Sequence, residues 1–164
     1  MTITHDHRGP HIVLDCSLPS EVTAISPFVD KLMLLLRNCS CVPEGVSDVE
    51  IALREALANA IIHGNHEDRR KRVHVSCRCE PDEVSLTVKD EGSGFDIHTV
   101  PDPTARENIG SAHGRGILVM KGLMDEVCFE QGGVIVHMRK SAGQAPKGAS
   151  QGTRRERDDL DSVI

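Results

Sequence analysis

The strongest hydrophobic pattern in the chain lies between residues 44 and 64. Apolar residues recur there at spacings of three and four, which predicts a helix with one buried stripe. Glu55 and Asn59 lie one turn apart on the row beside that stripe, where a helix borders a cleft. Gly64 follows the last periodic residue and is typical of a left-handed C-terminal cap. The alternative is that Glu55 and Asn59 face water, although Asn is a poor helix former and marks a position with a specific role. The predicted stripe consists of Leu53, Ala56, Leu57, Ala60 and Ile61.

A second pattern, strict alternation of apolar and polar residues, ends at Asp90 and predicts a half-buried strand over residues 83–90. Val84, Leu86 and Val88 take the inward positions, and Asp90 shares their parity. A carboxylate on the inward face is costly unless a group donates hydrogen bonds to it. Because a carboxylate is an acceptor only, it suits a donor such as the exocyclic amino group of adenine. The alternative is a strand that simply ends in an Asp-Glu-Gly turn.

Glycines follow this strand and recur before a third apolar segment. Gly92 and Gly94 allow the backbone to turn sharply and to approach a ligand closely. Gly114 and Gly116 precede apolar residues with helical spacing, which predicts a helix near residues 115–124. A glycine-rich helix entry exposes backbone N–H groups and the positive end of the helix dipole, which favours phosphate. The alternative is a flexible loop that joins the helix.

The remaining periodic segments complete an α+β pattern. The apolar spacing over residues 20–38 is helical, and Pro27 lies either in the first turn of a helix capped by Ser26 or at a kink. The order of elements predicts a two-layer α/β sandwich, with a mixed, mostly antiparallel sheet and helices on one face. Strands are expected at 11–18, 73–80, 83–90, 126–130 and 134–140.

Three segments lack a core-forming pattern. Residues 1–10 are expected to form a flexible N-terminus, and residues 97–113, which contain two prolines and no periodicity, suit a mobile lid over a nucleotide. Residues 142–164 are rich in Gly, Ser and charge and nearly devoid of apolar residues, so they predict a disordered tail. The folded domain is therefore expected to span residues 11–141.

Three motifs together resemble those of a known superfamily. REALANAIIHGN resembles the N box of the GHKL superfamily of ATPases, DEGSGFD resembles its first glycine box, and HGRGILVMKGLMDEV its second. Within that superfamily the chain is most similar to bacterial anti-sigma-factor serine-protein kinases (RsbW-like), over residues 10–141. The resemblance implies the GHKL, or Bergerat, ATP-binding fold. Many relatives carry Gly-Thr near the last strand, where this chain has Gly132-Gly133-Val134, so no role is transferred to that loop.

The resemblance also implies roles for the residues that match the motifs. Glu55 resembles the catalytic general base. Asn59 resembles the residue that binds the nucleotide through a Mg²⁺ ion held by its side-chain oxygen. Asp90 resembles the carboxylate that recognises adenine. The other positions that match nucleotide-binding residues are Gly92, Gly94, Gly114, Arg115 and Gly116.

The function implied by the resemblance is that of an ATP-dependent serine-protein kinase and anti-sigma factor. Such a protein sequesters a sigma factor and phosphorylates a serine of an anti-anti-sigma partner (a STAS-domain protein), and relatives suggest a homodimer. An alternative is an ATP-gated protein-binding module without kinase activity. A sensor histidine kinase is disfavoured, because only about forty residues, beginning with a predicted strand, precede the N-box helix.

Composition excludes several other classes of function. The chain has 164 residues, enough for one domain with a sizeable core. A net charge of −6, 2% aromatic residues and no Trp or Tyr argue against direct binding to nucleic acid. No apolar run is long enough for a membrane span or a signal peptide, which predicts a cytoplasmic protein. The six cysteines include no CxxC pair and are expected neither to bind zinc nor, in a reducing cytoplasm, to form disulfides.

Overall fold

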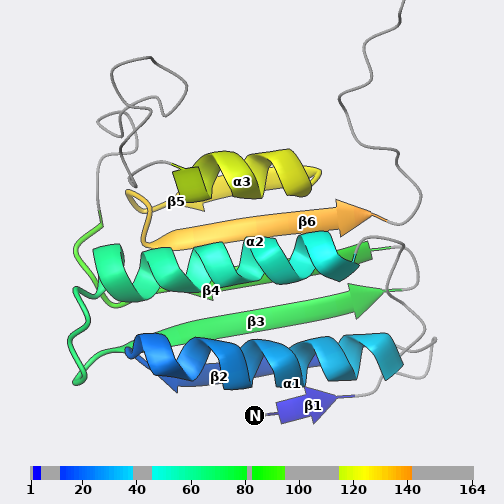
Figure 1. Ribbon diagram of the computed structural model, residues 1–164, viewed down its shortest axis with the longest axis horizontal. Helices are drawn as coiled ribbons and strands as arrows, with labels where there is room; N and C mark the ends of the chain where they lie inside the picture. Colours follow the sequence, from blue (N-terminus) through cyan, green and yellow to red (C-terminus); the bar gives the residue numbers. More distant parts are fainter. Residues whose placement is uncertain (1, 5–11, 39–45, 81–82, 95–114, 142–164) are drawn as a thin grey trace, which may run out of the picture.

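The sheet of this protein is antiparallel at every described strand pair, and it runs in the order β1-β2-β3-β4-β6-β5 (Figure 1). The computed structural model describes residues 2–4, 12–38, 46–80, 83–94 and 115–141. Within these residues the strands are β1 (Thr2–Thr4), β2 (Ile12–Pro19), β3 (Arg72–Glu80), β4 (Glu83–Lys89), β5 (Glu126–Glu130) and β6 (Ile135–Ser141).

The helices form a second layer on one face of this sheet. Figure 1 shows α1 in front of β2, α2 in front of β4, and α3 beside β5 and β6. This arrangement confirms the predicted α+β sandwich, with its antiparallel sheet and its helices on one face. In chain order the helices are the 3₁₀ turn η1 (Val22–Ala24), α1 (Ile25–Asn38), α2 (Val46–Ala58), the π-helix η2 (Asn59–Gly64) and α3 (Arg115–Leu123).

The core lies between the two layers and follows the predicted periodicities. In β4 the inward residues Val84, Leu86 and Val88 are buried, and the intervening residues are partly exposed or exposed. The buried residues of α2 recur at helical spacing and pack against the same core. Asp90, the next inward position after β4, is 4% exposed. The alternation therefore carries a carboxylate to the edge of the apolar core.

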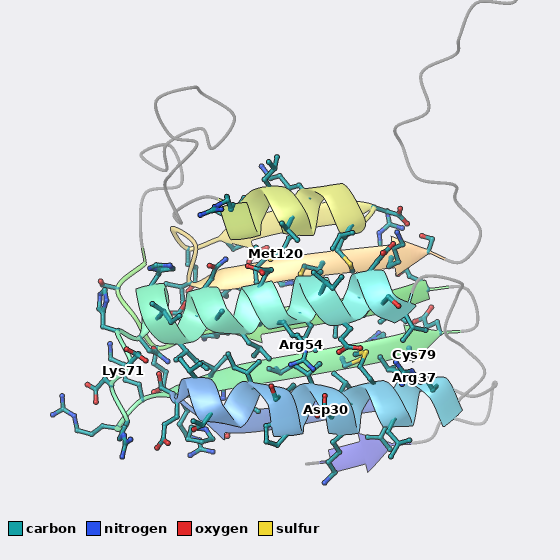
Figure 2. All side chains as sticks on the ribbon, viewed as in Figure 1. Asp30, Arg37, Arg54, Lys71, Cys79 and Met120 are labelled. Carbon is teal, nitrogen blue, oxygen red and sulfur yellow. The ribbon has the colours of Figure 1, made fainter. Side chains whose placement is uncertain are left out.

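Two polar contacts hold the helices in place. Arg54 of α2 points toward α1, where its Nη2 atom lies 2.9 Å from Asp30 Oδ1 (Figure 2). Lys140 of β6 is buried, and its Nζ atom donates to Asp48 Oδ2 (3.1 Å) and to the carbonyl oxygen of Leu123 (2.6 Å). Because Leu123 ends α3 and Asp48 lies in the first turn of α2, Lys140 ties these two helices to the sheet.

Two sequence expectations about helix ends are resolved by the structure. Helix α1 begins at Ile25, so Pro27 lies in its first turn, where a missing N–H group costs no intrahelical bond. The expectation that Gly64 forms a left-handed cap is wrong. Gly64 belongs to the π-helix, and among the described glycines those with positive φ are Gly94, Gly132 and Gly133. The side chain of Asp90 occupies the space beside Gly64, which explains why glycine is required there.

The cysteines differ from expectation at one position. Cys16, Cys77 and Cys128 are free thiols, and burial raises the pKa of Cys77 to about 12, as expected for a thiol in the core. Cys79, however, is disulfide-bonded, to none of the other described cysteines. The expectation that no disulfide forms was therefore wrong, since composition and compartment do not reveal which sulfur atoms a fold brings together.

Several sequence predictions concern residues outside the described part of the chain. These are the lid (97–113), the tail (142–164), Gly114 and most of the N-terminus (1–10). The described residues of that N-terminus, Thr2–Thr4, form β1 and pair with β2, where the sequence predicts no strand. Among the described helices, none is long and apolar enough to cross a bilayer.

Candidate nucleotide site

A pocket opens between the helix layer and the sheet where α2 passes into the π-helix. Asp90 lies at this pocket, Asn59 contributes to its wall, and the rest of the lining is mostly apolar. Figure 2 shows Met120 between α3 and α2, and its side chain is buried. The lining residues are Ala56, Asn59, Ala60, Val88, Asp90, Met120, Phe129, Gly133, Val134 and Val136.

Asp90 is positioned by the end of β4. Its backbone N–H donates to the carbonyl oxygen of Val134 (3.1 Å), which extends the pairing of β4 with the chain entering β6. Its Oδ1 atom accepts a bond of 2.7 Å from the N–H of Gly92. Burial raises the pKa of Asp90, opposed by the Gly92 bond and by the charges of Lys71 and His66. The carboxylate thus has one strong intramolecular donor and retains further acceptor capacity on the pocket side.

Glycines surround Asp90 because no side chain fits beside it. A Cβ atom at Gly64 would lie 2.4 Å from Oδ2 of Asp90, and one at Gly92 would lie 2.1 Å from the carbonyl oxygen of Gly64. Gly94 has φ of 77° and lies against the turn between β5 and β6, where a Cβ atom would be 2.6 Å from the carbonyl oxygen of Gly132. The turn Gly132-Gly133-Val134, which has no hydroxyl group where many relatives carry Gly-Thr, is therefore packed against the first glycine box.

Glu55 and Asn59 lie together beside α3, as their helical spacing predicts. Both side chains are partly buried. A Cβ atom at Gly116 would lie 2.7 Å from Glu55 Oε2 and 3.4 Å from both terminal atoms of the Asn59 side chain. Glycine at position 116 therefore allows the start of α3 to pack closely against the side chains of Glu55 and Asn59. Arg115, the first residue of α3, is exposed.

The described residues contain no cluster of three or more His, Cys, Asp or Glu side chains that could hold a metal ion. The oxygen atoms of Glu55 and Asn59 are nonetheless of the type that Mg²⁺ prefers. This ion is commonly bound by one or two protein oxygens together with water and the phosphates of a substrate. The donor set therefore fits a metal that arrives with a nucleotide.

A larger hollow of about 580 Å³ lies on the sheet face that the helices leave open. Its polar lining includes Asp15, Ser76, Arg78, Thr87 and His137, and it contains none of the predicted site residues. The smaller pocket at Asp90 is the better candidate, because it combines an apolar wall with a buried carboxylate.

Sequence reasoning missed part of this pocket. Met120 lies in the segment for which only a helix was predicted, and Phe129 and Val134 received no role, yet all three line the pocket. The signal for Phe129 was weak, since a partly buried aromatic residue in an edge strand has no distinctive pattern. The role of Asn65 was also missed. This residue follows the N-box helix directly, and the structure shows that it is fully buried.

Comparison with known proteins bears on this geometry. A family model for the histidine kinase-like ATPase domain matches residues 18–140. The anti-sigma F factor of Oceanobacillus iheyensis is 26% identical over 135 residues, which cover 79% of this chain and 82% of that protein. The anti-sigma F factor of Geobacillus stearothermophilus is 34% identical over 102 residues (58% of this chain, 69% of that protein), and that of Geobacillus kaustophilus is 35% identical over 101 residues (58% and 68%). The family match contains every residue that lines the pocket, and the chain belongs to the histidine kinase-like ATPase domain family.

Proposed function

We propose that this protein binds ATP in the pocket at Asp90 and transfers the γ-phosphate to a serine of a partner protein. The observation that carries the proposal is a buried carboxylate in an otherwise apolar pocket, with Asn59 on the pocket wall. The family match and the relatives named anti-sigma F factors support it. The position of the carboxylate supports a binding role, because a carboxylate with a purely structural role has no reason to face an apolar pocket.

Asp90 would select the base of the nucleotide. Its carboxylate accepts hydrogen bonds and donates none, so it would accept a bond from the 6-amino group of adenine. Guanine presents a carbonyl oxygen at the equivalent position, which a carboxylate repels. The apolar residues Val88, Met120 and Val136 would cover the ring. We therefore expect ATP to be preferred over GTP.

Asn59 and Glu55 would act at the phosphate end. The side-chain oxygen of Asn59 would hold Mg²⁺, which neutralises phosphate charge when it is bound. The remaining proposed nucleotide contacts are Gly92, Gly94, Gly114, Arg115 and Gly116. Of these, Gly114 lies outside the described residues. The close approach of Gly116 to Glu55 and Asn59 places the second glycine box beside both side chains.

Glu55 would serve as the general base for phosphate transfer. The serine oxygen of the partner forms a bond to the γ-phosphorus while the bond from that phosphorus to the bridging oxygen breaks and ADP leaves. The hydroxyl proton passes to the Glu55 carboxylate, which lies one turn before Asn59 on the same helix face. Because this transfer needs little covalent chemistry from the protein, positioning and charge neutralisation supply most of the rate.

The name anti-sigma F factor, which the relatives carry, supports a sigma factor as one partner. The other partners are those that the motif resemblance implies. We expect a sigma factor as the protein that is sequestered and an anti-anti-sigma protein with a STAS domain as the phosphorylated substrate, with the kinase acting as a homodimer in the cytoplasm. Neither nucleic acid nor a membrane is expected as a direct partner, given the net charge of −6.

The proposal is tested by retaining partners from a lysate of the source cells on the immobilised protein, with and without ATP and Mg²⁺. Retained proteins are then incubated with the protein and γ-labelled ATP, and the labelled residue is identified. We expect label on a serine of a retained partner. Nucleotide-dependent retention without any labelling would instead support a binding module without kinase activity.

A further inference from the structure

Asn65 is a buried polar residue that joins two distant parts of the chain. It follows the π-helix directly, and its relative exposure is 0%. Its Nδ2 atom donates to the carbonyl oxygen of Arg72 (3.0 Å), and its Oδ1 atom accepts from the N–H of Glu91 (2.9 Å). Both ends of the amide are therefore satisfied, and each is bonded to backbone rather than to another side chain.

The bond to Glu91 acts on the peptide that follows Asp90. Glu91 lies between Asp90 and Gly92, and these two residues are joined by the bond from the Gly92 N–H to Asp90 Oδ1. The Asp90 side chain has no room to relax, because it lies against Gly64 and because Gly92 lies against the Gly64 carbonyl. A change in the orientation of the Glu91 peptide would therefore be transmitted to the Asp90 carboxylate.

The backbone around Asn65 adopts an unusual path that brings its side chain to this position. The N–H of Asn65 donates to the carbonyl oxygen of Ala60 (2.8 Å), a bond across five residues that closes the π-helix. The next two residues, His66 and Glu67, have φ of 55° and 54° although neither is glycine. Irregular helix turns and left-handed non-glycine residues persist where the surrounding structure requires them, and they are frequent at functional sites.

We propose that Asn65 is a positioning residue that holds the Asp90 carboxylate in the orientation needed to read adenine, and thereby sets the preference for ATP over GTP. This inference rests on the proposed binding of ATP at Asp90. The contrasting role is purely structural, in which Asn65 only satisfies two buried backbone groups. The two roles differ in one respect: a structural role affects the fraction of folded protein, and a positioning role changes the discrimination between bases.

The test compares the binding of ATP and GTP to wild type and to Asn65→Ala by calorimetry, at a temperature where both are folded by circular dichroism. We expect Asn65→Ala to lower ATP affinity about tenfold and to reduce the ratio of ATP to GTP affinity by a similar factor. The control is Leu14→Ala, which truncates a buried residue of β2 outside the pocket. It should destabilise the protein while the affinity ratio stays at the wild-type value.

A second measurement applies if Asn65→Ala does not fold. Site-resolved hydrogen exchange on wild type should show that ATP slows exchange of the Glu91 amide, and that GTP at the same concentration does so much less. An unchanged affinity ratio in folded Asn65→Ala, or a Glu91 amide that does not respond to bound ATP, would overturn the role of Asn65 alone. A wild-type protein that binds no ATP would overturn the proposed function and this inference together, so the two failures are distinguishable.

Discussion

Glu55→Gln should lower the rate of phosphate transfer to the partner serine by about 10²–10⁴-fold, the usual contribution of a general base. The substitution keeps the size and polarity of the side chain and removes only its basicity. Because Glu55 lies beside Gly116 rather than on the apolar wall of the pocket, ATP affinity should remain within a few-fold of wild type. The measurement is transfer of label from γ-labelled ATP to the retained partner, run beside calorimetric titration with ATP.

A matched control lies five residues earlier in α2. Glu50 is partly buried and pairs with Arg54 through Oε1 (3.0 Å) and with Arg37 through Oε2 (3.7 Å), away from the pocket. Glu50→Gln removes the same charge from the same helix and should leave the transfer rate unchanged. If Glu55→Gln transfers phosphate at the wild-type rate, Glu55 is not the base, even where wild type is a kinase.

Asp90→Ala should abolish measurable ATP binding, and Asp90→Asn should weaken it by about 10–100-fold, because a hydrogen bond to a charged group contributes about 1.5–3 kcal/mol. Asn retains an acceptor for the Gly92 N–H, so the loop should stay folded in that variant. The control is Asp15→Asn on the open face of the sheet, which should bind ATP normally. Wild-type ATP affinity in Asp90→Asn, with an intact circular dichroism spectrum, would remove Asp90 from adenine recognition.

The raised pKa of Asp90 adds a dependence on pH. Asp90 accepts a stronger hydrogen bond from adenine when its carboxyl group is deprotonated, so ATP affinity should fall on acidification at a higher pH than an ordinary Asp would give. The contribution of Asp90 to folding stability changes with pH in the direction opposite to ATP affinity. Between the pKa of the unfolded chain and the raised pKa of the folded protein, the folded state binds more protons, so the contribution of Asp90 to stability falls as pH rises. Asp90→Asn should therefore remove this part of the pH dependence in thermal unfolding without nucleotide.

The parts of the site that the sequence predicts are those set by local periodicity. The alternation of Val84, Leu86 and Val88 predicts that Asp90 faces inward, because strand parity continues past the end of the hydrogen-bonded strand. The helical spacing of Glu55 and Asn59 predicts that they share a face. Both expectations depend on a few neighbouring residues and on backbone geometry alone, and the structure agrees with each.

The parts that the sequence does not predict depend on contacts between distant segments. Gly64 follows a helical pattern and is typical of a cap, whereas glycine is required there because of the Asp90 side chain, which follows strand β4 and is distant in sequence. The two bonds of Asn65 reach Arg72 and Glu91, and neither partner is visible in a local window. Phe129 enters the pocket because β5 lies beside β6 at the edge of the sheet, which is a property of the topology.

Calorimetric titration of the wild-type protein with ATP and with GTP in the presence of Mg²⁺ tests the claim that the pocket at Asp90 is an adenine nucleotide site. We predict saturable binding of one ATP per chain and GTP affinity lower by at least about tenfold, as expected when a donor is replaced by an acceptor opposite Asp90. Equal affinities for ATP and GTP, or no binding of either nucleotide, would contradict the claim.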